Sequence, residues 1–241
     1  MDKRTRLRLA WWAVFVLAAV PLGKLVADLA LARLGANPIE AILNRLGFWT
    51  LTLLVTSLAA TPANTLLGLA WPARVRRLLG LWAFAYGTLH LVCYVAVDQG
   101  LDVTLLLRDV AKRKFMTVGF TAWLLLVPLA VTSTDRWVQR LGFRAWKRLH
   151  RLVYVAAVLG VVHFVWRVKA DLLRPAIFAL VLGTLFLLRL VPRAWRARPR
   201  PATATWVSGG LGALHPRGVR HAPPVERSSP GPTPGSTPRP P

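Results

Sequence analysis

Long apolar segments, each about the length of a membrane-spanning helix, alternate with short basic segments along this chain. The two clearest apolar segments, at 78–97 and 115–134, run for twenty residues without a formal charge. Because a helix rises about 1.5 Å per residue, twenty residues cross a hydrocarbon core of about 30 Å. The pattern predicts an all-α integral membrane bundle of six transmembrane helices, at residues 9–31, 46–60, 78–97, 115–134, 149–166 and 175–191.

The first, second and sixth segments depart from this simple pattern. The first contains Lys24 and Asp28, which lie four residues apart and can therefore pair on one helix face. The second is short and is expected to end before Pro62, because proline interrupts a helix interior. The sixth has 14 uncharged residues before Arg189, so it depends on long side chains that reach the membrane surface from its ends.

Residues 192–241 have a different composition from the rest of the chain. This segment holds 12 of the 18 prolines, eight arginines and one acid, with few large apolar side chains. Such a segment cannot bury a core and is expected to be disordered. We therefore predict a cytoplasmic N-terminus at 1–8, a transmembrane domain at 9–191 and a disordered cytoplasmic tail. The tail histidines, His215 and His221, are not expected to belong to a site.

The chain is strongly basic, with a formal net charge of +23. In a soluble protein this charge would favour nucleic-acid binding, but here the charges avoid the apolar segments, so a nucleic-acid partner is not expected. Over the predicted loops and ends, 20 Lys and Arg lie on the side of the N-terminus and 9 on the other. Since basic loops stay in the cytoplasm, both termini are predicted there, with anionic lipid as a further contact. A cleaved signal peptide is a competing interpretation of residues 1–36, although the apolar stretch is long for one.

Histidines are the main candidate metal ligands, because the chain has a single cysteine, Cys93, and two methionines. Two apolar segments share one local frame, in which an alanine and a glycine precede a histidine by seven and three residues: Ala83, Gly87 and His90 in one, and Ala156, Gly160 and His163 in the other. On a helix these positions share a face. Each frame therefore predicts a groove of small residues that ends in an imidazole and can hold a flat apolar ligand such as haem.

His90 and His163 are also expected at the same depth in the membrane. His90 lies 13 residues beyond Arg77 and His163 lies 13 residues beyond His150, each counted from the inner edge of its segment. Both are thus about 20 Å from the cytoplasmic boundary. Two imidazoles at one depth on different helices can bind one iron from opposite sides, so we predict that His90 and His163 are the axial ligands of a haem. The alternative is that each histidine only hydrogen-bonds a neighbouring helix.

His150 is a third candidate, with several possible roles. It lies at the membrane edge, and on an ideal helix it is about 140° round from His163. A second haem would need a histidine at the same level of the third segment, where Arg76 and Arg77 stand instead. His150 can therefore ligate a second haem with an unusual partner, contact a propionate, bind another cofactor, or be an interfacial histidine without a site.

Further polar residues could support a cofactor. Arg167 and Lys169 lie beyond His163 and could hold haem propionates, and Tyr86 and Tyr154 could donate hydrogen bonds. A basic collar at the inner edge could receive the phosphate of a flavin nucleotide, or it could serve only to anchor the helices: Arg74, Arg76, Arg77, Lys147 and Arg148.

Several of these stretches resemble the MsrQ (formerly YedZ) family. The likeness covers about residues 8–190 and rests on a specific combination: Arg76-Arg-Leu-Leu-Gly-Leu-Trp-Ala-Phe-Ala-Tyr-Gly-Thr-Leu-His90, Thr117-Val-Gly-Phe, Leu129-Ala-Val-Thr-Ser-Thr134, Trp146-Lys-Arg-Leu-His150-Arg-Leu-Val-Tyr154 and His163-Phe-Val-Trp166. The resemblance implies that the family's three haem-associated histidines fall on His90, His150 and His163. The tail from about residue 192 departs from the family pattern.

The resemblance implies a six-helix haem b protein of the bacterial inner membrane, in the ferric-reductase-like transmembrane group, that holds one or two haems and also binds FMN. Members of the family pass electrons from quinol or a cytoplasmic flavin reductase to MsrP. This partner is a periplasmic molybdopterin enzyme that reduces methionine sulfoxide in oxidised proteins. The chain is then an electron-transfer subunit for protein repair that does not itself reduce methionine sulfoxide. The alternatives are a membrane oxidoreductase that reduces a ferric or cupric acceptor directly, and a cofactor-free packing or transport protein.

Overall fold

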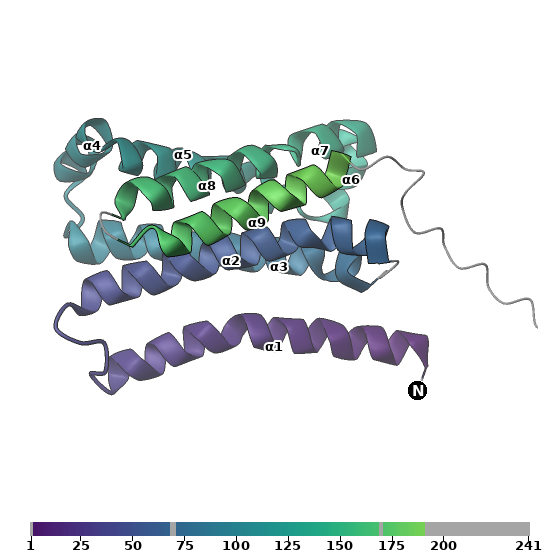
Figure 1. Cartoon of the computed structure of the whole chain (residues 1–241), viewed down its shortest axis with the longest axis horizontal. Coiled ribbons are helices and arrows are strands. Elements are labelled where there is room, and N and C mark those ends of the chain that lie inside the picture. The colour runs from purple at the N-terminus through teal and green to yellow at the C-terminus, as the bar shows by residue number, and fades with distance from the viewer. Residues whose placement is uncertain (1, 68–70, 169–170, 191–241) are drawn as a thin grey trace, which may run out of the picture. The chain divides into compact units, whose positions relative to one another are not determined.

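The computed structural model describes residues 2–67, 71–168 and 171–190, so the predicted tail at 192–241 lies outside the described residues (Figure 1). These ranges are mostly helical, with short loops between the helices, and no strand occurs in them. In chain order the helices are α1 (Lys3–Ala30), α2 (Pro38–Leu67), α3 (Trp71–Cys93), the π-helix η1 (Tyr94–Asp98), α4 (Val103–Lys112), α5 (Lys114–Val131), α6 (Asp135–Leu141), α7 (Phe143–Leu149), α8 (Leu152–Arg167) and α9 (Leu173–Leu190).

Within the described residues, six helical segments are long and apolar enough to cross a membrane, which confirms the predicted all-α bundle. They are Leu7–Ala30, Pro38–Asn64, Val75–Asp98, Lys114–Val131, Phe143–Arg167 and Leu173–Leu190. Their flanks expose large apolar side chains that a soluble protein would cover, among them Leu17 (72% exposed) and Leu180 (71%). Apolar surface of this extent needs an apolar environment, and lipid acyl chains supply it. The chain is a multi-pass membrane protein.

The prediction for the second segment is wrong in its length, because α2 begins at Pro38 and continues through Pro62 to Leu67. A proline inside a helix has no N–H for the carbonyl four residues earlier, which here belongs to Leu58. That carbonyl instead accepts a hydrogen bond from Nη2 of Arg189, at 2.7 Å. A side chain from α9 therefore satisfies the oxygen that the proline leaves without its helical donor, and the helix can continue.

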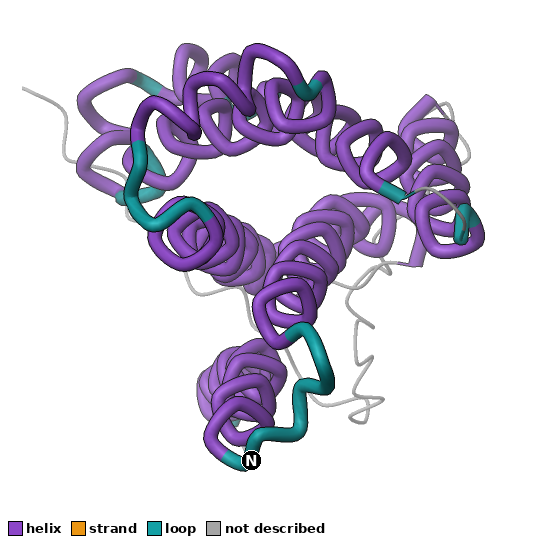
Figure 2. Tube along the Cα trace, turned by 90° about the vertical axis from the view of Figure 1, so that its left-hand side faces the viewer, coloured by secondary structure: helices purple, strands orange, loops and turns teal. Residues whose placement is uncertain are grey.

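Four of the helices form a closed ring, in the order α2, α3, α5 and α8. The contacts between α2 and α3 and between α5 and α8 are the most extensive, and contacts of α3 with α5 and of α2 with α8 close the ring. Figure 2 looks along these helices from the end at which α4 lies. Because α3 and α8 are not neighbours in the ring, they stand at opposite corners. α9 packs beside α2 and α8, and α1 packs on the outside of α2 and α3.

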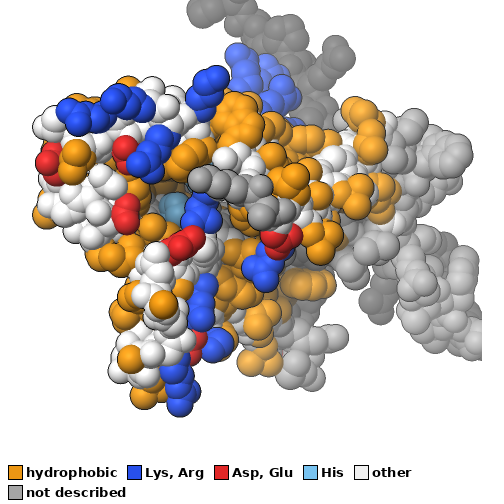
Figure 3. All heavy atoms as spheres, turned by 60° about the vertical axis from the view of Figure 1, so that its left-hand side comes forward, with side chains coloured by type: hydrophobic (Ala, Val, Ile, Leu, Met, Phe, Trp, Pro, Cys, Tyr) orange, Lys and Arg blue, Asp and Glu red, His pale blue; other side chains and the backbone are white. Residues whose placement is uncertain are grey.

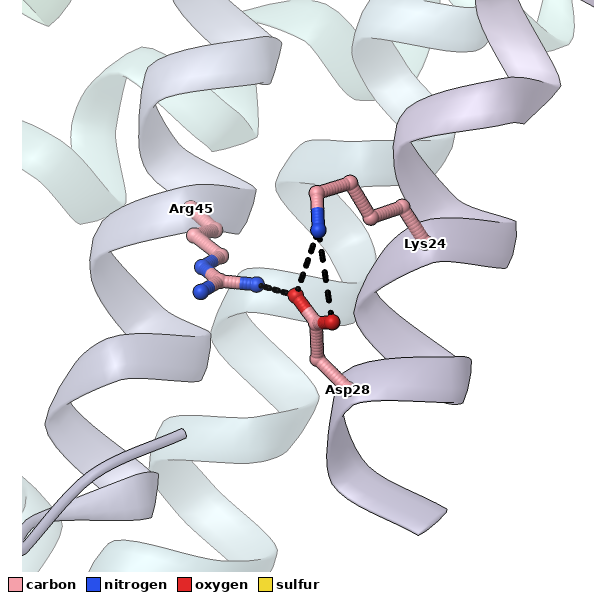
Figure 4. Close-up of polar contacts among 3 residues, drawn as sticks. All are labelled: Lys24, Asp28 and Arg45. Carbon is pink, nitrogen blue, oxygen red and sulfur yellow. Dashed lines mark hydrogen bonds and ion pairs between the residues drawn. The ribbon is translucent and has the colours of Figure 1, made fainter. Parts of the chain in front are cut away.

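Two polar contacts attach α1 to the ring. Asp28 is buried (7% exposed) and pairs both with Lys24 on its own helix, at 3.0 Å, and with Arg45 on α2 (Figure 4). The predicted pairing of Lys24 with Asp28 is therefore confirmed, and Arg45 extends it between helices. Nearer the middle of α1, the hydroxyl of Tyr86 on α3 donates to the carbonyl of Ala18, at 2.8 Å.

The helix ends define two polar regions of the bundle, which we name after the short helices there. The α4 end comprises the loop between α1 and α2, the helix α4 and the C-terminus of α8, and the α6 end comprises α6, α7 and the C-terminus of α9. Seen from the side that brings the α4 end forward, charged side chains of both signs gather at this end. A histidine is visible among them, and apolar side chains cover the flank (Figure 3).

Candidate functional site

His90 and His163 meet across the middle of the ring. His90 lies near the C-terminus of α3, and His163 lies one turn before the end of α8. Their ring centroids are 6.3 Å apart, with the ring planes at 86° to each other. Since α3 and α8 occupy opposite corners, each imidazole reaches inward toward the other. The two histidines predicted to lie at one depth are thus brought together.

Each of these rings is held by a backbone carbonyl of a neighbouring helix. Nδ1 of His90 lies 3.0 Å from the carbonyl oxygen of Leu43 on α2, and Nδ1 of His163 lies 2.7 Å from that of Phe115 on α5. A carbonyl oxygen can only accept, so each Nδ1 carries the proton and donates it. Nε2 of each neutral ring then keeps its lone pair, which is the arrangement found in histidines that bind metal ions.

A glycine makes room for each ring, four residues after the carbonyl that holds it. A Cβ atom at Gly119 would lie 2.4 Å from Nδ1 of His163, which is far inside a normal contact. A Cβ atom at Gly47 would lie 3.3 Å from Cε1 of His90. Neither glycine was predicted as a site residue, although Gly119 lies in one of the stretches that resemble the family. A glycine inside an apolar helix was the available signal, since its small side chain permits close approach.

The small residues of the two predicted grooves are all packed against other helices. Ala83 and Ala156 are fully buried, at 0% and 1% exposed. A Cβ atom at Gly87 would meet Thr50 of α2 at 3.3 Å and Trp123 of α5 at 3.8 Å, and one at Gly160 would meet Leu51 of α2 at 3.3 Å. In the structure these four positions allow close helix packing, and their contact with a cofactor stays a prediction.

The opposed rings fit the iron of a haem. A bond between a metal ion and an imidazole nitrogen is about 2 Å long, and the centre of the ring lies about 1 Å further on, so two rings on one ion have centres about 6 Å apart. The centroid separation of His90 and His163 agrees with this. The fixed Nδ1 protons leave Nε2 as the ligand atom on both sides, and the helices around the pair are apolar. These features match the donor set of a bis-histidine haem.

His150 is in a different environment, at the α6 end. It follows the last residue of α7, and α8 begins two residues later at Leu152, so the chain does not run as one straight helix from His150 to His163. Nδ1 of His150 lies 3.1 Å from the carbonyl of Trp146 on its own helix, and the two ring centroids are 4.0 Å apart with the planes tilted by 31°. Nε2 is buried and makes no hydrogen bond within the described part of the chain.

Several of the remaining predicted polar residues have partners of their own. Nη2 of Arg167 lies 3.4 Å from Glu40 at the start of α2, and Arg77 pairs with Asp135 at 3.0 Å. The hydroxyl of Tyr86 is committed to α1, so the expectation that it hydrogen-bonds a cofactor is wrong. Tyr154 accepts a hydrogen bond from Nη1 of Arg189, whose guanidinium also lies over its ring. The side chain of Arg74, and the whole of Lys169, lie outside the described residues.

Comparison with known proteins identifies a matching family model and several similar proteins. A family model described as "Ferric reductase like transmembrane component" matches residues 46–161. The chain is 52% identical to the protein-methionine-sulfoxide reductase heme-binding subunit MsrQ of Rhodospirillum rubrum, over 81% of this chain and 94% of the relative. It is 48% identical to the protein of the same name from Ralstonia nicotianae, over 80% and 89% of the two chains, and 45% identical to that of Caulobacter vibrioides, over 79% and 87%.

Proposed function

We propose, since this chain belongs to the MsrQ family of haem-binding subunits, that it transfers electrons through the membrane to a methionine sulfoxide reductase. The observation that carries the proposal is the opposed pair of His90 and His163, with both Nδ1 protons committed to backbone carbonyls. These residues would hold the iron of haem b through Nε2. When bound, such a haem supplies reversible one-electron transfer.

This chain's own residues supply the position and the surroundings of the ligand atoms. The carbonyls of Leu43 and Phe115 prevent either ring from rotating, and Gly47 and Gly119 let the rings approach the neighbouring helices closely. Arg167 lies one turn beyond His163 at the α4 end, where its charge suits a haem propionate. His150, with its unpartnered Nε2, is the candidate ligand for a second haem or another cofactor at the α6 end.

We further propose the orientation of the bundle in a bacterial inner membrane. Basic residues at the α6 end support a cytoplasmic location for that end and for both termini, because basic segments are retained on that side: Arg76, Arg77, Arg136, Arg140, Arg144, Lys147 and Arg148. The α4 end then faces the periplasm. The histidine pair lies toward this end, close to a periplasmic acceptor. The charge of the α6 end suits the phosphate of FMN.

The proposed donor is quinol or a cytoplasmic flavin reductase, and the proposed acceptor is a periplasmic molybdopterin enzyme of the MsrP type. Oxidation of one quinol to quinone releases two electrons and two protons. Reduction of one methionine sulfoxide consumes two electrons and two protons and yields methionine and water. This balance suits a subunit that transfers electrons and leaves the sulfoxide chemistry to its partner, for the repair of oxidised periplasmic proteins.

Reoxidation of the reduced chain tests the proposal. The purified protein in nanodiscs is reduced without oxygen and mixed with an MsrP-type enzyme and methionine sulfoxide, while the Soret band is followed. We expect rapid reoxidation only when both the enzyme and the sulfoxide are present. A preparation with no reducible Soret band would refute the haem assignment itself.

The match to a ferric-reductase-like family model favours a second candidate, direct reduction of a small ferric or cupric acceptor. The same experiment separates the two functions. Rapid reoxidation by a ferric chelate alone, with no acceleration by the partner enzyme and sulfoxide, would support the second candidate and contradict the first.

A further inference from the structure

The short helix α4 links two membrane spans and cannot extend far from them. The preceding span ends with η1 at Asp98, and a single residue, Arg113, separates α4 from α5. The first turn of α4 is closed by Asp102, whose carboxylate accepts hydrogen bonds from the backbone N–H groups of Thr104 at 2.8 Å and Leu105 at 3.0 Å. This helix is therefore well formed and lies at the level at which the neighbouring spans end.

The side chains of α4 divide into three directions, which follow from about 100° per residue. Leu106, Asp109 and Val110 are partly buried and face the bundle. The next direction is apolar and exposed, with Val103 at 63% and Leu107 at 64%, and Leu101 continues it at 68% in the preceding turn. The third direction is exposed and mainly basic, with Arg108 and Lys112, and Leu105 (42% exposed) lies beside Lys112.

Polar contacts fix this orientation of the helix. The hydroxyl of Tyr94 in η1 donates to Asp109 at 2.7 Å, and Nε of Arg113 lies 3.3 Å from the same carboxylate. Tyr94 is buried (8% exposed). Since the bundle-facing side of α4 is held in this way, the exposed side with Val103 and Leu107 cannot turn inward to cover itself.

We propose that α4 is an interfacial helix that lies on the membrane leaflet at its own end of the bundle. Its apolar side, Leu101, Val103 and Leu107, enters the outermost acyl region, and Arg108 and Lys112 reach the lipid phosphates. The apolar side continues the exposed apolar flank of the membrane spans, through Val97 (55% exposed) at the end of η1. An apolar side next to a basic one is the pattern of helices that lie in the plane of a membrane surface.

Fluorescent labels on opposite sides of α4 test this proposal. In a Cys93→Ala background, Leu107→Cys and the matched control Lys112→Cys are each labelled with bimane, and the protein is placed in nanodiscs whose lipids carry a nitroxide on the upper part of the acyl chain. We expect lipid-borne quenching at position 107 to exceed that at 112 at least several-fold, and quenching by aqueous iodide to show the opposite order. The quenching measurement does not require bound haem, so its result is independent of the proposed function.

Two results would overturn the proposal. Equal quenching by iodide at both positions would mean that the apolar side is in water. Protection of position 107 that appears only when an MsrP-type enzyme is added would make this side a docking surface for protein instead of lipid. A second pair of variants, Val103→Cys and Arg108→Cys, guards against a local effect of one label and must show the same order for the proposal to stand.

Discussion

The histidine pair near the α4 end and His150 at the α6 end differ in how the protein holds them. His90 and His163 each donate Nδ1–H to a carbonyl on another helix, and each ring fits beside a glycine. His150 bonds a carbonyl of its own helix, and its ring lies tilted against that of Trp146. The two rings of the pair are therefore held by carbonyls of other helices, whereas the ring of His150 has its hydrogen bond within its own turn of chain and lies against the Leu129 backbone of α5.

This difference teaches what a transmembrane ligand pair requires beyond the histidines themselves. A ring that is held by another helix keeps its direction only while that helix stays in place, so ligand geometry and bundle packing are coupled. His150 has its hydrogen bond within its own turn, and no histidine at its level faces it from the described part of α3. We expect substitutions to separate the two regions sharply.

The largest effect is expected from removal of a ligand. His90→Ala and His163→Ala should each abolish stable haem binding at the pair, because one imidazole alone leaves the iron with an open axial position. His150→Ala should reduce the haem content only in part. A reduced-minus-oxidised spectrum of each purified variant, scaled to protein concentration, measures this. Full haem retention in His163→Ala would refute the proposed ligand pair.

The next largest effect is expected from Gly119→Ala. The added methyl group would lie 2.4 Å from Nδ1 of His163, so the ring must leave its place and lose the hydrogen bond to Phe115. We expect most of the haem to be lost, or the midpoint potential to shift if it stays. Gly47→Ala, with a closest approach of 3.3 Å, should have a smaller effect.

Gly183→Ala is the matched control for these two variants, because no atom lies within 4 Å of the added methyl group. Alanine favours a helix over glycine by about 1 kcal/mol, so this variant should fold at least as well as the natural chain. Haem loss in Gly183→Ala equal to that in Gly119→Ala would show that the effect comes from the helix and not from the ring.

A third prediction concerns the hydrogen bond that joins α9 to α2 at the α6 end of the bundle. Arg189→Met removes the donor to the Leu58 carbonyl, which Pro62 has deprived of its helical partner. The loss of a buried charged hydrogen bond should cost about 1.5–3 kcal/mol of folding free energy. In the background of Pro62→Ala the helical N–H is restored, so the same substitution should cost clearly less. Equal costs in both backgrounds, measured by denaturant unfolding in micelles, would contradict this account.

Much of the fold and part of the site could be predicted from the sequence. Uncharged apolar stretches predict the membrane spans, and the equal spacing of His90 and His163 from the basic edges of their spans predicts one depth for both. Each of these signals lies within a single span, so the sequence alone reveals it. The path of α2 through Pro62 could not be predicted, since it depends on Arg189, which lies 131 positions from its acceptor, Leu58. The break between α7 and α8 at His150 carries no proline or glycine of its own, so the sequence offers no local signal for it.

The smallest effect is expected from Trp146→Phe. This change removes the hydrogen bond from Nε1 of Trp146 to the carbonyl of Thr132, at 2.9 Å, but keeps an aromatic ring beside His150. Stability should fall by about 1 kcal/mol, the usual value of one neutral hydrogen bond. The Soret band of the histidine pair should not change, because His90 and His163 take their positions from α2 and α5. A loss of that band in Trp146→Phe would show that the two regions depend on each other, and the contrast between them would then fail.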